Sequence, residues 1–388
     1  MSNTLRLREK QHKFGRAETL QRVCVVQRAL SKRTVVDGAL VSTLTDPILE
    51  KNPTTHTSWS IGAPGGPERV PSQEVPLQVG ALDVLRMLFV WRREDLRDAE
   101  ALWRLAFGSA HRLTPQRWVP VLGYLRIPRI CWFSYVLCGI RLWSRSASRF
   151  AVQFDELYIV CFYDARCLAL TRAFRAQGKP VIEVQHGLIA PCHAIYGNEQ
   201  FWRIGGDLAP TGFLVWDAPT KNFIEQVTLR HATIRDFDHS YYFSDSHSVA
   251  ETHANCILVT LQWGTLLPTD VLDVIATRSD LRWLLRMHPN DRTPSVKRAD
   301  CTRLAELSNV EIVEASSPLH LDLSRSILHL TENSSVVIEA ATVGVYSVFW
   351  DERCMSAFKT QIAKGLASHC PPTRVADCVR QFFADRQR

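Results

Sequence analysis

The sequence predicts an α/β protein built from two doubly wound domains with parallel sheets, preceded by a basic, partly helical N-terminal region. From residue 155 onwards, short apolar runs alternate with segments of helical periodicity, which is the pattern of parallel strands joined by helices. A polar, His-rich stretch at residues 229–254 divides this alternation into two sets. Short polar motifs follow several of the apolar runs, and in such folds the carboxyl ends of the strands form the ligand crevice.

The first set opens as a β-α-β unit. Its predicted elements are strands at 157–162, 181–184 and 213–216 and helices at 165–177 and 219–227. Gly178 stands where helices commonly end, and Pro180 leads into the second strand. Strands joined by a helical crossover run parallel, so their carboxyl ends meet at one edge of the sheet.

The second set repeats the alternation. Its predicted strands lie at 257–261, 283–287, 310–313, 327–330 and 345–350, and its helices near 269–277, 301–307, 318–325 and 335–343. Residues 373–385 have a one-sided apolar pattern and are expected to form a last helix.

These patterns suggest the following division of the chain. Residues 1–80 form a poorly defined N-terminal segment with strands at 23–26 and 34–41, 81–230 a first domain, 231–254 a linker, 255–370 a second domain and 371–388 a C-terminal helix. Residues 81–107 are expected to be helical. Residues 118–143 interleave aromatic residues and arginines, which fits either an interfacial amphipathic segment or a buried helix whose arginines reach outward.

Composition and charge are those of a globular protein with one basic half. Residues 1–150 contain 23 Lys and Arg against 12 Asp and Glu, a net charge of +11, whereas the whole chain carries +7. Such a surface can meet an anionic membrane, an anionic substrate or nucleic acid. No apolar run is long enough to span a membrane and no secretory signal is evident, so a cytoplasmic protein is expected. Eleven cysteines without a CxxC pair predict reduced thiols.

Two motifs in the second set suit a phosphate group. Arg286 and His288, in the run RMHP, share one face of a strand end and offer a cation and an imidazole. A strand-end His bonded to a neighbouring loop is the alternative. The polar turn that begins at Thr260 offers further hydroxyl and N–H groups to a phosphate.

The second motif follows the strand at 327–330. Asn333, Ser334 and Ser335 lie where a helix begins, so hydroxyl groups and backbone N–H groups can face a phosphate there. Glu339, one turn into the helix, can accept a hydrogen bond from a ribose hydroxyl. Plain helix capping with a solvated Glu339 is the alternative.

His186 follows a strand of the first set, in the run QHG. Gly187 permits close backbone approach, and the imidazole can act as a general base on a sugar hydroxyl. His193 and Asp164 are alternative bases or orienting partners for it.

In this order, QHG, RMHP and TENSSVVIEA resemble the GT-B glycosyltransferases of bacterial capsule and surface-polysaccharide assembly. The chain is most similar to the groups with an HP motif and a Ser-Ser motif, which include bacterial sialyltransferases and Kdo transferases. The resemblance covers residues 155–365. The acidic pair followed by glycine that supplies the base in bacterial sialyltransferases is absent, which leaves His186 or an acidic residue such as Asp164 as the base.

The resemblance implies two Rossmann-like domains that face a cleft. The acceptor would lie on the first domain, beside Gln185, Gly187 and His193, and the nucleotide-sugar on the second, with His288, Ser334 and Ser335 on its phosphate. The C-terminal helix would pack back on the first domain. The implied partners are a nucleotide-sugar, CMP-activated sugars included, and a glycan or lipid-linked glycan acceptor, and no metal or other cofactor is expected.

The sequence therefore predicts a cytoplasmic, metal-independent glycosyltransferase with His186, His288 and Asp164 as catalytic residues. Its basic first half would dock either an anionic glycan or the inner face of the plasma membrane. Within the same fold, a polyol-phosphate transferase and a UDP-sugar epimerase are the alternatives. Outside this chemistry, the alternatives are a nucleic-acid-binding protein, for which no motif speaks, and a non-catalytic scaffold.

Overall fold

The computed structural model describes residues 22–77, 140–237 and 255–386, with gaps at 29–33, 37–38, 43, 54, 62–67, 69, 141–142, 192, 194, 205, 230, 262–266, 289–302 and 314–316. The helix expected at 81–107, most of the stretch 118–143 and of the linker 231–254, and the turn after Leu261 lie outside these residues.

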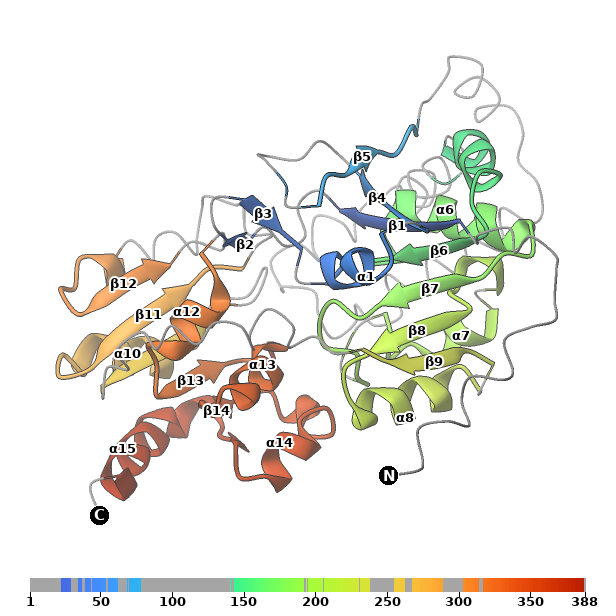
Figure 1. Cartoon of the computed structure of the whole chain (residues 1–388). Helices are drawn as coiled ribbons and strands as arrows, with labels where there is room; N and C mark the ends of the chain where they lie inside the picture. Colours follow the sequence, from blue (N-terminus) through green and yellow to red (C-terminus); the bar gives the residue numbers. More distant parts are fainter. Residues whose placement is uncertain are drawn as a thin grey trace, which may run out of the picture.

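The described residues form two parallel sheets, as the sequence predicts (Figure 1). The first has the order β5-β4-β1-β6-β7-β8-β9. Its strands are β1 (Val23–Arg28), β4 (His56–Ile61), β5 (Gln73–Glu74), β6 (Glu156–Ile159), β7 (Val181–Val184), β8 (Gly212–Val215) and β9 (Thr233–Asp236). Because β6, β7 and β8 are buried on both faces, they read as unbroken apolar runs, apart from Glu156 and Glu183.

The second sheet has the order β12-β11-β10-β13-β14-β15. Its strands are β10 (Cys256–Thr260), β11 (Arg282–Arg286), β12 (Val310–Val313), β13 (Leu328–Thr331), β14 (Tyr346–Phe349) and β15 (Ala367–His369). The chain runs from β10 outward to one side and then returns to the other side at β13. The junction between these two directions is the switch point where open α/β sheets bind their ligands.

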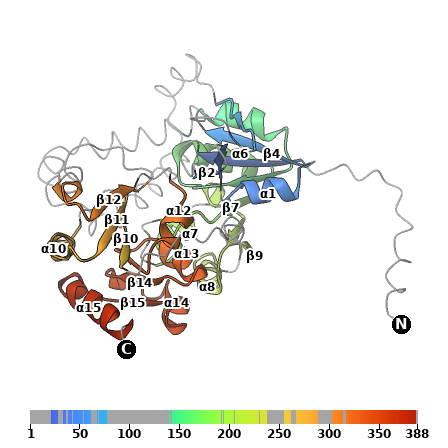
Figure 2. The same ribbon diagram turned by 60° about the vertical axis from the view of Figure 1, so that its left-hand side comes forward.

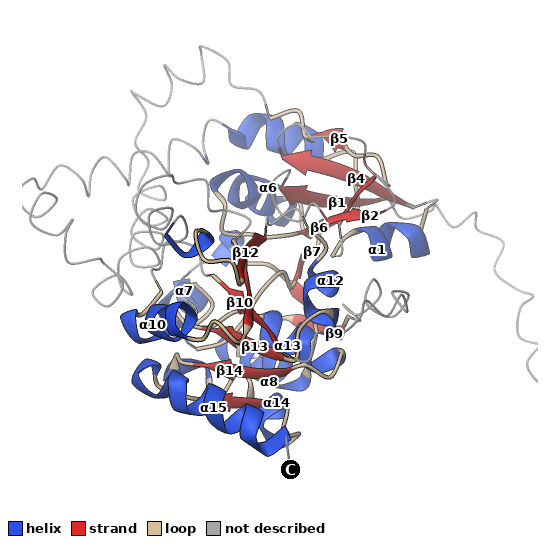
Figure 3. Cartoon of the chain, turned by 90° about the vertical axis from the view of Figure 1, so that its left-hand side faces the viewer, coloured by secondary structure: helices blue, strands red, loops and turns tan. Residues whose placement is uncertain are grey.

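Helices cover both faces of each sheet (Figure 3). On the first sheet, α6 (Ala165–Ala176), α7 (Glu199–Ile204) and α8 (Ala218–Val227) pack on one face and α1 (Asp46–Lys51) on the other. On the second sheet, α10 (Thr269–Thr277) and α15 (Val375–Arg386) pack on one face, and α12 (Leu319–Ser324) and α13 (Val336–Thr342) on the other. The remaining elements are the antiparallel hairpin of β2 (Thr34–Val36) and β3 (Ala39–Val41), and α14 (Lys359–Ala363).

The first sheet begins earlier in the chain than the sequence suggests. Strand β1 pairs with both β4 and β6, so residues 23–74 belong to the same sheet as the strands after residue 155. At the other end, β9 lies inside the stretch expected to be a linker. Short strands of this kind escape detection because their apolar runs are brief or mixed with polar residues.

The C-terminal helix α15 packs on its own domain and not back on the first. Its buried residues Val375 and Val379 join the cluster that contains α10. In Figures 1 and 2, α15 lies on the side of the second sheet away from the first domain. Among the described cysteines, Cys370 and Cys378 form a disulfide and the five others are free thiols, so the prediction of reduced thiols is corrected for this pair alone. The short loop between β15 and α15 brings the two cysteines together.

Within the described part of the chain, no helix combines the length and apolar character needed to cross a bilayer.

Candidate functional site

The two domains meet through the loop that follows β7. Leu188 and Ala190 of this loop and Trp216 at the end of β8 share one apolar cluster with the second domain. Their partners there include Val337 and Ile338 of α13, Phe349 of β14 and Phe358 before α14. Figures 1 and 2 show α13 between the second sheet and the first domain. The contact holds the segment that carries His186 against the helix that follows Ser335.

His186 lies among aromatic and acidic side chains at the carboxyl end of β7. Its Nε2 is 3.1 Å from the hydroxyl of Tyr163, and its buried Nδ1 is 3.6 Å from Oε1 of Glu183. The His186 side chain is 20% exposed, so one side of the imidazole meets solvent. An imidazole in this setting can accept a proton from a ligand hydroxyl group at its open side.

Glu183 is a residue that sequence reasoning missed. It interrupts the apolar strand β7, is fully buried, and accepts a 2.5 Å hydrogen bond from the hydroxyl of Tyr196. Burial raises the pKa of the Glu183 carboxyl to about 8, while hydrogen bonds from Tyr196 and from backbone amides oppose this rise. A carboxyl in the middle of a buried strand was the available signal, because such a group is rarely placed there without a specific use.

The other acceptor-side residues hold the loop in place. Gln185 is fully buried; its amide donates to the carbonyl of Gly187 at 3.0 Å and its Oε1 accepts from the Trp216 amide N–H at 2.8 Å. Nδ1 of His193 accepts from the backbone amides of Ile195 and Tyr196. Burial lowers the pKa of His193 to about 4, so this imidazole is neutral. A side chain at Gly187 would meet no described atom within 4 Å.

Asp164 has a role in the local fold. Its carboxylate is the N-cap of α6, accepting from the Arg166 amide at 3.0 Å, and its Oδ1 lies 3.8 Å from the Arg166 guanidinium. This arrangement stabilises the start of the helix. The residues that the structure brings to His186 include Tyr163 and Glu183.

Three strand ends of the second sheet are level with one another. Thr260 at the end of β10 pairs with Arg286 on β11 and with Thr331 on β13. The motifs that follow, with His288 after β11 and Ser334 after β13, therefore leave the same edge of the sheet on either side of β10. This is the switch point of the domain.

The Arg286 side chain binds groups of its own domain. The guanidinium forms a buried ion pair with Asp322 and donates to the carbonyl oxygen of Ser317 at 2.6 Å. Burial raises the pKa of the Asp322 carboxyl, and Arg286 opposes this rise. Burial lowers the imidazole pKa of His320, and the nearby positive charge of Arg286 lowers it further. The pair ties α12 to the end of β11, close to the partly buried His288.

Thr260 likewise has an internal partner. Its hydroxyl is 2.9 Å from Nε2 of His329, whose Nδ1 is 3.0 Å from the hydroxyl of Ser347. Burial lowers the pKa of His329 to about 3, so the imidazole is neutral and can donate from one nitrogen and accept at the other. This row of hydrogen bonds across β10, β13 and β14 gives the buried polar side chains partners. The Thr260 hydroxyl is thus used within the fold and not for a ligand.

The serines after β13 play different parts. Ser334 Oγ accepts from the Val336 amide at 3.3 Å, and its own amide donates to Thr331 Oγ1. Ser335 precedes α13, and its hydroxyl forms no hydrogen bond within the described residues. Asn333 donates to the carboxylate of Asp351 at 3.1 Å. Several of the N–H groups at the start of this seven-residue helix are thus already used.

Glu339 lies four residues after Ser335 on α13, so the two side chains share one helix face. The residue is only 8% exposed, and within the described part of the chain its carboxylate makes no hydrogen bond. Of the predicted donor-side residues, Ser335 and Glu339 therefore have side chains that form no hydrogen bond within the described residues. Across the described residues, no three His, Cys, Asp or Glu side chains gather as metal ligands would.

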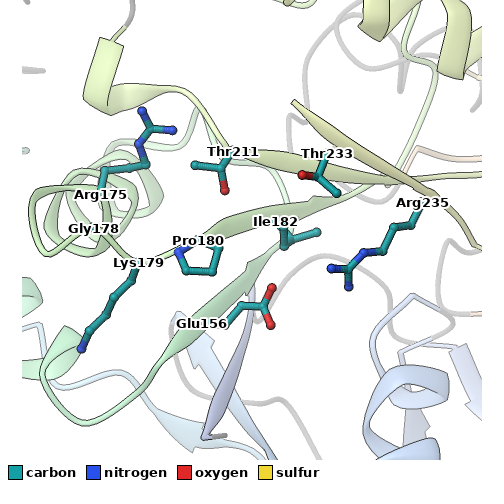
Figure 4. A pocket seen from close by; sticks show the side chains of 9 residues that line it. All are labelled: Glu156, Arg175, Gly178, Lys179, Pro180, Ile182, Thr211, Thr233 and Arg235. Atoms are coloured by element: carbon teal, nitrogen blue, oxygen red, sulfur yellow. The ribbon is translucent and has the colours of Figure 1, made fainter. Parts of the chain in front are cut away.

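A depression of about 600 Å³ lies at the opposite edge of the first sheet (Figure 4). It is bordered by residues at the amino-terminal ends of β6 to β9, among them Glu156, Pro180 and Thr233. Burial raises the pKa of Glu156, and the nearby Arg235 opposes this rise. Because His186 follows the other end of β7, this depression is separate from the candidate site.

Comparison with known proteins gives a likeness in structure alone. No protein-family model matches the chain, and no curated protein matches it in sequence. Similar solved structures include UDP-GlcNAc 2-epimerase from Neisseria meningitidis bound to UDP-GlcNAc, with a TM-score of 0.54 and 12% identity over 95% of this chain and 92% of that one. They also include Anabaena HepE in complex with UDP and glucose, with a TM-score of 0.54, 11% identity and coverage of 95% and 91%.

The UDP-GlcNAc 2-epimerase of Methanocaldococcus jannaschii, in complex with UDP-GlcNAc and UDP, has a TM-score of 0.52 and 9% identity over 94% of this chain and 93% of that one. At these identities the likeness concerns the fold. The chain accordingly has the GT-B fold, with two parallel-sheet α/β domains.

Proposed function

We propose that this protein is a glycosyltransferase that moves a sugar from a nucleotide-sugar to a hydroxyl group of a surface glycan or lipid-linked glycan, without a metal ion. The observation that carries the proposal is the contact between the β7 loop and α13. It joins the loop after His186 to the helix after Ser335, which supports a site where strand ends from the two domains face each other. Two facing sites suit a reaction between two ligands better than the binding of one.

The second domain is the proposed donor side. His288 and Ser335 leave the same sheet edge on either side of β10, so both can hydrogen-bond one phosphate group. Glu339, on the face of α13 that carries Ser335, is the proposed partner of the ribose. Three proteins of the same fold were solved with UDP or UDP-GlcNAc, which supports a nucleotide-sugar as the ligand class. In place of a cation, these hydrogen-bond donors stabilise the charge that develops on the leaving phosphate.

The first domain is the proposed acceptor side. His186 Nε2 takes the proton of the acceptor hydroxyl as its oxygen bonds to the anomeric carbon. The bond from that carbon to the phosphate oxygen breaks, and its electron pair leaves with the nucleotide. The ion pair of Arg286 and Asp322 fixes the end of β11 on the donor side. Gln185 fixes the loop that carries the imidazole.

A sugar epimerase is the second candidate. Two of the similar structures are UDP-GlcNAc 2-epimerases, and a buried carboxyl beside an imidazole also suits proton transfer to and from a sugar carbon.

A screen of CMP, UDP and GDP by thermal shift identifies the base, because a ligand that binds the folded protein raises its melting temperature. Product analysis with the matching nucleotide-sugars then separates the candidates. Sugar transferred to an added glycan, with turnover unchanged in EDTA, supports the proposal. A free nucleotide-linked epimer identifies an epimerase, and phosphate retained in the product identifies a phosphotransferase. Activity lost in EDTA and restored by manganese contradicts metal independence.

A further inference from the structure

A buried carboxyl lies beside the face of His186 that is turned away from solvent. Glu183, on strand β7, precedes His186 by three residues in the sequence. Its fully buried carboxyl comes within 3.6 Å of the imidazole Nδ1. A distance of 3.6 Å is an electrostatic contact rather than a hydrogen bond. Contacts of this length in catalytic sites often tighten into hydrogen bonds when the substrate is bound.

The Glu183 carboxyl is fixed by groups that point at it. Tyr196 Oη donates to Oε1 at 2.5 Å, and the backbone amide of Phe162 donates to the same oxygen at 3.4 Å. Oε2 is buried and accepts no hydrogen bond from the described residues. Cys161 adopts a left-handed φ of 64°, which is costly for a residue other than glycine. Strain of this size persists where the surroundings require it, and here it turns the chain so that its amides face the carboxyl.

The open side of the imidazole has its own partner. Nε2 lies 3.1 Å from the hydroxyl of Tyr163. With the ring proton on Nδ1, towards Glu183, the Nε2 lone pair accepts from the Tyr163 hydroxyl and is the place where the imidazole can take up a proton. A carboxylate behind a histidine selects this tautomer and stabilises the imidazolium that forms.

We propose that Glu183 is a positioning residue for His186, which acts through the imidazole without touching the substrate. The inference rests on the proposed role of His186 as the base. When Nε2 takes the proton of the acceptor hydroxyl, the imidazole becomes a cation, and the Glu183 carboxylate supplies its counter-charge inside the protein. The proton stays on the imidazole until it returns to solvent after the transfer.

The other groups around the carboxyl are poor substitutes for this role. Tyr196 faces Glu183, and burial with nearby acidic groups raises the pKa of its hydroxyl well above the ordinary value. His193 packs on Tyr163 and Tyr196, and burial keeps it neutral. Tyr163 and the Cys161 thiol complete the neighbourhood. Among these groups, Glu183 is the carboxyl that can balance a charge on His186.

The pH at which the base is ready follows from the same contacts. Because burial raises the pKa of the Glu183 carboxyl to about 8, the carboxylate form that can balance an imidazolium gains population as the pH rises towards that value. The Tyr196 hydrogen bond lowers the Glu183 pKa, so its removal should move this ionisation to higher pH.

The test is the titration of His186, followed by NMR of protein with labelled histidine and assigned with His186→Asn. We expect Glu183→Gln to weaken proton binding by the imidazole at least tenfold, because the counter-charge is gone. We expect Tyr196→Phe to shift the titration of the pair in the opposite direction. Glu156→Gln, which changes a buried carboxyl at the other edge of the same sheet, is the matched control and should leave the titration unchanged. Identical His186 titrations in wild type and Glu183→Gln would overturn the proposal.

This readout needs no substrate, so it separates the proposal from the proposed function. If the titrations shift as expected while no nucleotide-sugar is turned over, the pairing stands and the glycosyltransferase assignment fails. Where turnover is found, its rise with pH should shift in Glu183→Gln and in Tyr196→Phe in the same directions as the NMR titrations. A uniform loss of rate with an unshifted pH profile would mean that Glu183 has only a structural role.

Discussion

Asp322 and Arg286, 36 residues apart in the chain, form a buried ion pair at the donor edge of the second sheet. The arginine that the sequence offers as a phosphate ligand is thereby occupied within the fold. Its guanidinium links the end of β11 to α12 and to the Ser317 carbonyl. The positive charge of Arg286 still lies near the candidate phosphate site. We expect it to act on a bound phosphate through its charge and not through direct contact.

This pair predicts an asymmetric effect of mutation. Asp322→Ala leaves an uncompensated buried cation and should lower the free energy of unfolding by about 3–5 kcal/mol. Replacing both residues, as in Arg286→Met with Asp322→Leu, should recover most of that loss, because no charge then remains buried. Urea denaturation of the two variants measures the difference. Equal destabilisation of the single and double variants would mean that the two side chains do not depend on each other.

The serines after β13 offer a matched pair. Ser334→Ala removes the hydroxyl that accepts from the Val336 amide, and should lower the free energy of unfolding by about 1 kcal/mol. Ser335→Ala breaks no hydrogen bond of the described fold, and should leave stability within about 0.5 kcal/mol of wild type. Its loss should instead weaken nucleotide binding tenfold or more, as expected for a hydrogen bond to a charged group.

Thermal unfolding and calorimetric titration of the same two variants test this division. Nucleotide affinity unaffected by Ser335→Ala would remove Ser335 from the phosphate site.

Two histidines with lowered pKa values predict a loss of stability in acid. Burial lowers the pKa of His193 to about 4 and of His329 to about 3, below the ordinary value near 6.5. The unfolded chain therefore takes up protons first as the pH falls below 6.5. Each histidine should then lower stability by up to about 1.4 kcal/mol per pH unit until its folded pKa is reached.

Comparing wild type with a variant that replaces the row Thr260, His329 and Ser347 by Val, Leu and Ala isolates the His329 part. The variant should lose stability less steeply between pH 6.5 and 4. Parallel pH curves for the two proteins would show that His329 does not carry the effect. Comparison with wild type is needed because Glu183 has the opposite effect. Its pKa is raised in the folded protein, so the free energy of unfolding falls as the pH rises from about 4.5 to 8.

The sequence was sufficient for the sheets because buried parallel strands are nearly continuous apolar runs. Strands β7 and β12 begin and end at the predicted residues, as does α10. Strand β5 and β9 are short and lie at sheet edges, where polar residues hide the pattern. The partner of α15 also could not be read from its own apolar face, since either domain offers an apolar surface.

The candidate site was predictable in place but not in detail. Strand-end motifs located His186 and Ser335, because the topology fixes which edge carries the ligand. The partners of these residues come from distant parts of the chain. The Asp322 that occupies Arg286 and the Tyr163 beside His186 share no local pattern with them. Glu183 was visible only as a carboxyl in an apolar strand, and its use follows from the packing above it.

His288 is proposed to bind the nucleotide, and His186 a second ligand on the facing domain. Calorimetric titration of the preferred nucleotide into His288→Ala and His186→Asn tests this division most directly. We expect at least tenfold weaker binding in His288→Ala and unchanged affinity in His186→Asn, which should still lose sugar transfer. Nucleotide affinity that is equal to wild type in both variants, or reduced only in His186→Asn, would contradict the assignment of the two histidines.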